Sequence, residues 1–501
     1  MATTTTSSAD AGPTYRFGPL ERRGLIAGLR KGQVGVVVAA AVVAIAALVA
    51  GVPHAIWWAA AGLGGGLWVA FKPLRGRTVE QWAPIWVTYW VRTLSGGRIW
   101  RNDAPTLGHP SLGGGPTRPH LPPALNTVRM LDTVGPHGEL MGVLREAVCY
   151  TAVVQVRPQS FALCDRDEQA RRLAGWGGVL AGLAREGSPV SRLQWVERTT
   201  PADGGALVRA ARAGLAVPDT HPLAATYLDL VEAAGPVTQA HETFVAIQID
   251  ATRAPRLVKA GGGGDPGALA VLRREVATLA DGLAAADIPV TGVLGPRQLA
   301  HVLRVGFDPS ARPALSALAA TPGREEGLCA NSAWPAATEE SWAGYRADGT
   351  LHATYWVEEW PRIPVAPRFL SKFLLGTTAA RTVAVIAEPM APSEAIRQVE
   401  AARTHDHADD ELRRRLGFLP TARRRRQAEG TAEREEELAD GHGEYRFSGY
   451  ITVSAATADD LEDACGDVEH HAQKANLQLT RLRGQQAQAF TWTLPLCRGL
   501  R

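Results

Sequence analysis

The sequence has one long stretch without charge. Between Gly32 and Phe71 there is no Asp, Glu, Lys or Arg, although these four types make up 21% of the 501 residues. An apolar run of about 20 residues can cross a bilayer as a helix, and the stretch holds two runs, from Val34 to Val52 and from Ala55 to Phe71. Only two residues separate them, which suits a tight turn. We therefore predict a two-span transmembrane hairpin over residues 32–72, in preference to two buried core helices.

Cysteine is scarce. The chain has five cysteines, an odd number at wide spacings, and no CxxC pair. A disulfide framework or a structural zinc site needs cysteines that pair or recur at short intervals. These five predict reduced thiols in a cytosolic environment.

A phosphate-binding loop is also missing. Such a loop joins a glycine-rich turn to Lys and Ser or Thr, because amides and the lysine hold the phosphates. The best glycine cluster, Gly261–Gly264, is followed by Asp265 and Pro266, so we interpret it as a strand-to-helix connection. His405 and Asp409 would share a helix face but supply only two metal ligands. We expect no catalytic residue, no cofactor, no metal and no enzyme activity.

Basic residues flank the uncharged stretch on both sides. They include Arg22, Arg23, Arg30 and Lys31 before it and Lys72, Arg75 and Arg77 after it, whereas the turn between the two runs has no Lys or Arg. Basic flanks stay on the cytoplasmic side. The protein is therefore predicted to be multi-pass in the plasma (inner) membrane, with both termini cytoplasmic. A cleavable signal is excluded because the apolar stretch begins beyond residue 30 and turns back.

Tryptophans mark the predicted membrane surface. Trp57 and Trp58 lie near a span end, where amphipathic rings prefer the headgroup zone. Trp82, Trp86 and Trp90 recur every fourth residue, and on a helix that starts near position 81 they form one aromatic stripe suited to the inner interface. Pro84 would then lie in the first turn of that helix.

The remainder shows the same order of elements twice. Each half reads strand-helix-strand, helical insert, strand-helix-strand, which fits a ferredoxin-like split βαβ unit with its helices on one face of an antiparallel sheet. The first set comprises strands 149–157, 193–199, 243–252 and 289–294 with helices 166–186, 205–214, 222–234 and 267–285; the second comprises strands 354–360, 382–388, 450–454 and 477–483 with helices 367–375 and 458–476. The fold class predicted is thus a membrane α-hairpin plus an α+β cytoplasmic body of two ferredoxin-like halves with helical inserts.

Seven segments follow from these patterns. They are a disordered tail with a basic membrane-proximal segment (1–31), the two-span hairpin (32–72), an interfacial aromatic helix (73–106), a linker (107–123), a first ferredoxin-like α+β domain (124–310), a second one (340–501) and, within the second, a helical insert (393–440).

Two stretches carry a resemblance to a known family. The sequence from Gly344 to Pro361, and that from Ile451 to Pro495, resemble the amino-terminal, non-motor domain of the conjugation and type IV secretion ATPases. The front, from Phe17 to Trp100, is similar to the small two-helix inner-membrane subunit that accompanies this ATPase. The whole resembles actinobacterial membrane proteins of such systems. In the family the Leu-Pro ending leads into the motor, whereas this sequence ends six residues after Pro495.

The resemblance implies a non-catalytic inner-membrane scaffold that anchors a separately encoded motor ATPase of a type IV secretion-like or conjugation-like system. Other copies of the chain and the lipid bilayer are the further expected partners; a small-molecule substrate is not expected, and with a net charge of only +3 nucleic acid is expected at most indirectly. The alternative is a two-span membrane component of a type VII secretion apparatus. We expect the motor to dock on Arg423, Arg424, Arg425, Arg426, Phe490, Trp492, Leu494 and Pro495.

Overall fold

The computed structural model describes most of the chain. The described residues are 31–49, 54–71, 78–102, 121–157, 159, 161–201, 204–234, 239–319, 333–415, 430, 436, 438 and 441–500. Several predicted features lie outside them: the tail, most of the linker, the second half of the insert, and the basic residues Arg22, Arg23, Arg30, Lys72, Arg75, Arg77 and Arg423 to Arg426.

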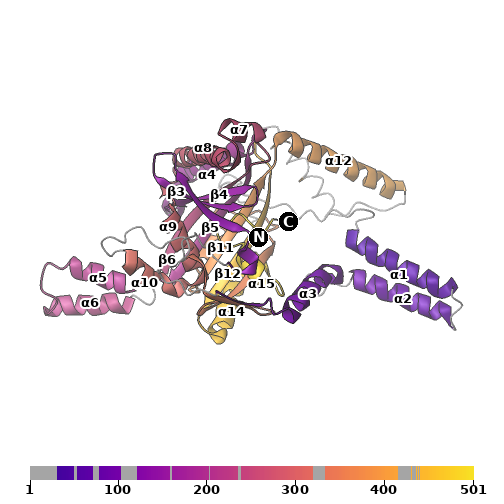
Figure 1. The fold of residues 1–501 in the computed structure, drawn as a ribbon, viewed down its shortest axis with the longest axis horizontal. Coiled ribbons are helices and arrows are strands. Elements are labelled where there is room, and N and C mark those ends of the chain that lie inside the picture. Colours follow the sequence, from indigo (N-terminus) through magenta and orange to yellow (C-terminus); the bar gives the residue numbers. More distant parts are fainter. Residues whose placement is uncertain are drawn as a thin grey trace, which may run out of the picture.

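One antiparallel sheet forms the centre of the body (Figure 1). Its main path runs β1-β8-β9-β10-β12-β11-β5-β6-β4-β3-β2, with β13 beside β10 and β7 beside β4, so that it has 13 strands. This confirms the mixed α+β class. The strands are β1 (Ile99–Arg101), β2 (Val128–Val134), β3 (Leu140–Glu146), β4 (Cys149–Val156), β5 (Val190–Pro201), β6 (Gln239–Asp250), β7 (Val290–Val293), β8 (Ala337–Glu340), β9 (Tyr345–Ala347), β10 (Thr350–Glu359), β11 (Arg381–Pro389), β12 (Tyr445–Ala455) and β13 (Gln478–Arg481).

Two sets of four strands in this sheet have the same order. The first is β7-β4-β6-β5 and the second is β13-β10-β12-β11. If the four strands of each set are numbered 1 to 4 along the chain, their order across the sheet is 4-1-3-2 in both sets. A split βαβ unit gives this order. The two sets meet where β5 pairs with β11, with Val196 opposite Ala384, so the halves share one continuous sheet.

Helices cover one face of both sets. On the first set lie α4 (Arg166–Leu183) and α8 (Gly264–Ala285), and on the second lie α11 (Ser371–Leu374) and α14 (Ala458–Lys474). Leu193 packs under α4 and α8, and Glu197, four residues further along β5, points to the same face. Glu197 lies opposite Val383, which packs under α14. The two helical layers are therefore on the same side of the sheet.

The opposite face carries a second layer that the sequence did not predict. It consists of α9 (Pro296–Phe307), α15 (Gln486–Phe490) and the chain that follows α15. Leu303 and Phe490 of this layer share one buried cluster with Val196 of β5 and Ala384 of β11. The expectation of helices on one face alone was therefore wrong, because the sheet buries both of its faces.

Helical pairs project from two ends of the body (Figure 1). The uncharged stretch forms α1 (Lys31–Val49) and α2 (Ala55–Phe71), which lie side by side and lead to α3 (Val79–Leu94). At the other end are α5 (Gly204–Ala213) and α6 (Pro222–Ala234). The predicted insert begins as α12 (Pro392–Arg415), which in Figure 1 lies on the same side of the body as α1 and α2. Among the described residues, the other α-helices are α7 (Pro255–Ala260) and α10 (Arg312–Ala319). In the part of the chain that is described, no helix has both the length and the apolarity needed to cross a membrane.

Candidate membrane interface and adjacent cleft

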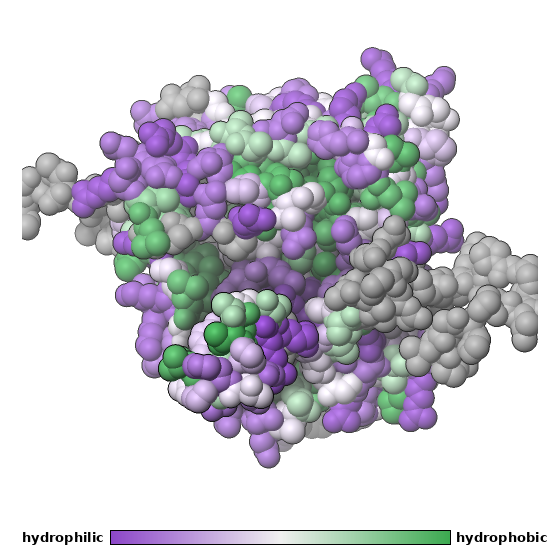
Figure 2. All heavy atoms as spheres, turned by 90° about the vertical axis from the view of Figure 1, so that its left-hand side faces the viewer, coloured by the Kyte–Doolittle hydropathy of each residue, from purple (hydrophilic) through white to green (hydrophobic). Residues whose placement is uncertain are grey.

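The helical hairpin exposes many apolar side chains. Val43 is 62% exposed, Trp57 77% and Trp68 56%, whereas the side chain of Trp58 lies outside the described part of the structure. The two helices approach closely at Gly66, where a Cβ atom would lie 2.4 Å from that of Ala40. A contiguous apolar surface of this kind is uncommon on a protein that contacts only water. Seen from the end that carries α5 and α6, by contrast, the body shows mainly hydrophilic side chains with apolar patches between them (Figure 2).

The tryptophan stripe of α3 divides between the body and the outside. Trp82 is buried and stacks on Trp342, with ring centroids 6.0 Å apart. Trp86 is 45% exposed and Trp90 is 62% exposed. The difference arises because residues four apart turn by about 40° around a helix, so the stripe rotates away from the body along α3. The predicted interfacial role can therefore apply to the last two rings, and Trp82 anchors the helix to the body.

The start of α3 also differs from the prediction. The helix begins at Val79, after Thr78 as N-cap, and the Thr78 amide donates to the Gln81 side chain at 3.2 Å. Pro84 consequently lies in the second turn, not in the first. The capping pair places the start two residues earlier than the aromatic spacing suggested.

Polar contacts fasten the end of α3 to the body. Arg92 forms an ion pair of 3.1 Å with the buried Glu340 of β8, whose other oxygen accepts from the amide of Ala487 at 3.0 Å. Arg98 donates to the hydroxyl of Tyr89 at 2.9 Å. Glu340 thereby joins the end of α3 to β8 and to α15.

A cleft of about 610 Å³ lies beside these contacts. Four arginines and two glutamates line it, together with aromatic rings and two cysteines: Arg92, Arg98, Arg192, Arg498, Glu146, Glu340, Trp100, Tyr345, Trp492, Cys149 and Cys497. The elements that bring these residues together come from positions 92 to 498 of the chain, so no local motif could have shown the cleft.

Each glutamate of the cleft has its own arginine. Glu340 pairs with Arg92, and Glu146 pairs with Arg498, whose Nε lies 2.8 Å from the Glu146 carboxylate. Burial raises the pKa of Glu146, but the hydrogen bond and charge of Arg498 outweigh burial, so the net shift of this pKa is downward. Both carboxylates are therefore already neutralised inside the cleft.

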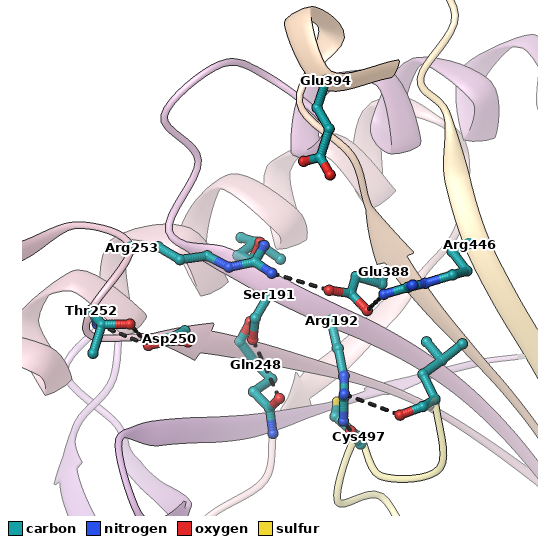
Figure 3. Close-up of polar contacts among 12 residues, drawn as sticks. Ser191, Arg192, Gln248, Asp250, Thr252, Arg253, Glu388, Glu394, Arg446 and Cys497 are labelled. Carbon is teal, nitrogen blue, oxygen red and sulfur yellow. Dashed lines mark hydrogen bonds and ion pairs between the residues drawn. The ribbon is translucent and has the colours of Figure 1, made fainter. Parts of the chain in front are cut away.

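Among the described residues, the other two arginines donate hydrogen bonds only to uncharged groups, although the charge of Arg192 also helps to lower the pKa of Glu146 and of Glu388. Arg192 donates to the backbone carbonyls of Cys497 and Leu500 at 3.0 and 3.4 Å, and it points toward Cys497 in Figure 3. Arg98 has the Tyr89 hydroxyl. With four arginines against two glutamates in its lining, the cleft has an excess of positive charge.

The predicted docking residues at the chain end lie against the sheet. Phe490, Trp492, Leu494 and Pro495 are all buried. The side-chain amide of Gln194 on β5 donates to the carbonyls of Trp492 and Leu494, each at 2.9 Å. Docking through this segment stays a prediction, and it would require the segment to leave the core of its own chain.

A second polar cluster closes the junction between the halves. Glu388 of β11 accepts from Arg253 at 3.1 Å and from Arg446 at 2.9 Å (Figure 3). Burial raises the pKa of Glu388, yet the hydrogen bond from Arg446 and the nearby positive charges lower it overall. A smaller cleft of about 410 Å³ lies beside this cluster.

The glycine cluster serves as a turn between two helices. It joins α7 to α8, not a strand to a helix, and Gly262, Gly263 and Gly264 all have positive φ. Asp265 accepts from Arg145 of β3 at 2.8 Å and from the hydroxyl of Tyr150 of β4 at 2.7 Å, so these contacts hold the start of α8 to the sheet. Across the described ranges, no three His, Cys, Asp or Glu residues gather as a possible metal site.

The fold and these surfaces define a class of protein in which an apolar two-helix hairpin carries a large α+β body. Residues 237–357, which run from β6 to β10, match the model of the family described as "Putative type VII ESX secretion system translocon, EccE". No curated protein matches the chain.

The match corrects the main functional prediction. The match does not support a type IV secretion or conjugation protein. It supports the type VII alternative. The error has a physical cause: a split βαβ unit is a common way to pack two helices on a sheet, and a shared fold does not imply a shared function. The strand-rich stretches that resembled the conjugation ATPases indicated a type of fold, and they carried no evidence for that function.

Proposed function

We propose that the protein is a membrane component of a type VII (ESX) secretion apparatus, in which the hairpin holds the α+β body against the cytoplasmic face of the plasma membrane. The match of residues 237–357 to the EccE family carries this proposal. The apolar surface of α1 and α2 supports the membrane attachment.

The described helices of the hairpin are slightly shorter than a bilayer is thick, and neither has by itself the length and apolarity of a span. With 19 and 17 residues, α1 and α2 are about 28 and 26 Å long at 1.5 Å per residue. The hydrocarbon layer is about 30 Å thick, and a bilayer accommodates a small shortfall by local thinning. A hairpin also returns the chain to its starting side, so the basic flanks and the body would share the cytoplasmic side.

Next to the hairpin, α3 would lie at the membrane surface. Trp86 and Trp90 project outward and Trp82 holds the helix to the body, which is the arrangement an interfacial helix needs. The role we infer for the body, with its two ferredoxin-like halves, is a scaffold that contacts other components of the apparatus. We expect the purified protein to hydrolyse no ATP.

Topology is tested by cysteine labelling of whole cells. In a cysteine-free background, His54→Cys in the hairpin turn should react with an impermeant maleimide, and Thr220→Cys between α5 and α6 should react only after lysis. Thr220 is exposed, so lack of reaction before lysis would reflect its location and not burial. Labelling of Thr220→Cys in intact cells would refute the proposed orientation.

Membership of the apparatus is tested by secretion. A strain without the protein should lose type VII substrates from the culture medium, and the full chain should restore them. A chain without residues 31–71 should be present in the cytosol and fail to restore them. Normal secretion in the strain without the protein would contradict the proposal.

A further inference from the structure

We propose that the cleft beside α3 binds the headgroup of an anionic phospholipid, with the lipid phosphate on Arg98 and Arg192. This inference rests on the proposed membrane attachment, and it deepens it by naming a ligand. The cleft volume of about 610 Å³ lies within the range of about 300 to 1,000 Å³ found for small-molecule sites.

Charge is the first argument. The two glutamates of the cleft are bound by Arg92 and Arg498, so an anion that enters meets little repulsion. Arg98 and Arg192 keep donors that a phosphate can accept, because their described partners are a hydroxyl and two carbonyls. Guanidinium groups match the geometry of phosphate oxygens in pairs of hydrogen bonds.

Apolar residues beside the cleft are the second argument. Leu94 at the end of α3 is 83% exposed and Ile99 of β1 is 54% exposed. Gly97 and Arg98, which line the cleft, lie between Leu94 and Ile99 in the chain. On β1 the side chain of Ile99 points to the face opposite that of the cleft-lining Trp100 and is exposed to the outside. A cationic cleft on a segment with exposed apolar side chains fits an amphiphile at a membrane surface.

The position of α3 is the third argument. Its exposed tryptophans would place the helix at the depth of the headgroups, and the cleft opens beside the last turn of the same helix. A lipid could therefore reach the cleft without leaving the membrane surface. Basic groups near an anionic leaflet also gain from its surface potential.

The test is native mass spectrometry of the full chain in detergent micelles. Phosphatidylglycerol, phosphatidylcholine and inorganic phosphate are titrated separately into the wild-type protein, Arg98→Gln, Arg192→Gln and a matched control, Arg212→Gln, which changes an exposed arginine of α5. We expect the wild type and the control to retain phosphatidylglycerol in preference to phosphatidylcholine. Each cleft variant should bind phosphatidylglycerol at least about tenfold more weakly, as expected for loss of a charged hydrogen bond.

Two outcomes would overturn the site: equal retention of both lipids by the wild type, or wild-type retention by Arg98→Gln. Displacement of phosphatidylglycerol by equimolar inorganic phosphate would show an anion site with no use for the lipid, and it would also overturn the proposal. Arg98→Gln is the decisive variant because Arg192 also holds the chain end, and thermal melting of each variant reports any loss of folding. Membrane attachment is scored separately by carbonate extraction, so failure of the lipid site and failure of the anchor give different results.

Discussion

The end of the chain depends on one buried side chain. Gln194 is fully buried on β5, its Nε2 donates to the carbonyls of Trp492 and Leu494 at 2.9 Å each, and its Oε1 accepts from the amide of Cys497 at 2.6 Å. Replacing the glutamine would remove these three hydrogen bonds and leave the buried Cys497 amide without its partner.

The substitution Gln194→Leu keeps the approximate volume and removes all three hydrogen bonds. A buried polar group left unpaired costs about 1–3 kcal/mol and each further lost hydrogen bond about 0.5–1.5 kcal/mol, and neighbouring effects are not additive. We therefore expect the free energy that holds the chain end on the sheet to fall by about 3 kcal/mol. Because about 1.4 kcal/mol corresponds to a factor of ten, detachment of the segment should become roughly a hundredfold more frequent.

Hydrogen exchange of the full chain in detergent measures this effect. Amides of residues 491–497 should exchange about a hundredfold faster in Gln194→Leu, and those of β6 should be unchanged. The control is Gln473→Leu, at an exposed position of α14, which should leave both sets unchanged. An increase below about threefold at residues 491–497 would refute the assigned role of Gln194.

Two further predictions concern buried positions. Burial lowers the pKa of His352 to about 4, whereas the pKa of histidine in an unfolded chain is about 6.5. As the pH falls, the unfolded chain therefore takes up a proton at this residue before the folded chain does. The free energy of unfolding should consequently drop by up to about 3 kcal/mol between pH 6.5 and 4. His352→Gln should flatten this part of the curve of melting temperature against pH, and an unchanged slope would contradict the assignment. Gly306→Ala would place a Cβ atom 2.7 Å from Leu494 Cδ2 and should destabilise the protein by about 1–3 kcal/mol. Gly466→Ala in α14, where the new atom meets nothing within 4 Å, should instead stabilise it by about 0.5–1 kcal/mol, and equal melting temperatures for the two variants would disprove the packing argument.

Local sequence patterns determined the individual elements. The expected strand at 149–157 is β4 (Cys149–Val156), and the expected strand at 382–388 is β11 (Arg381–Pro389). The uncharged stretch forms two adjacent helices. They could be predicted because the gap in charge and the break in the apolar run are both visible along the chain. Alternation and helical periodicity depend on near neighbours, so one sequence suffices to recognise them.

Only the tertiary structure decided which distant elements meet. The pairing of β5 with β11 makes one sheet of the two halves, and the chain end then fills the face left open by α4, α8, α11 and α14. The same packing brings Arg98, Arg192 and Arg498 to one cleft, and it buries the aromatic residues that were expected to dock a partner. These contacts could not be predicted from local sequence patterns, because burial and charge pairing depend on residues hundreds of positions apart. Local periodicity indicates only the type of element in which a residue lies.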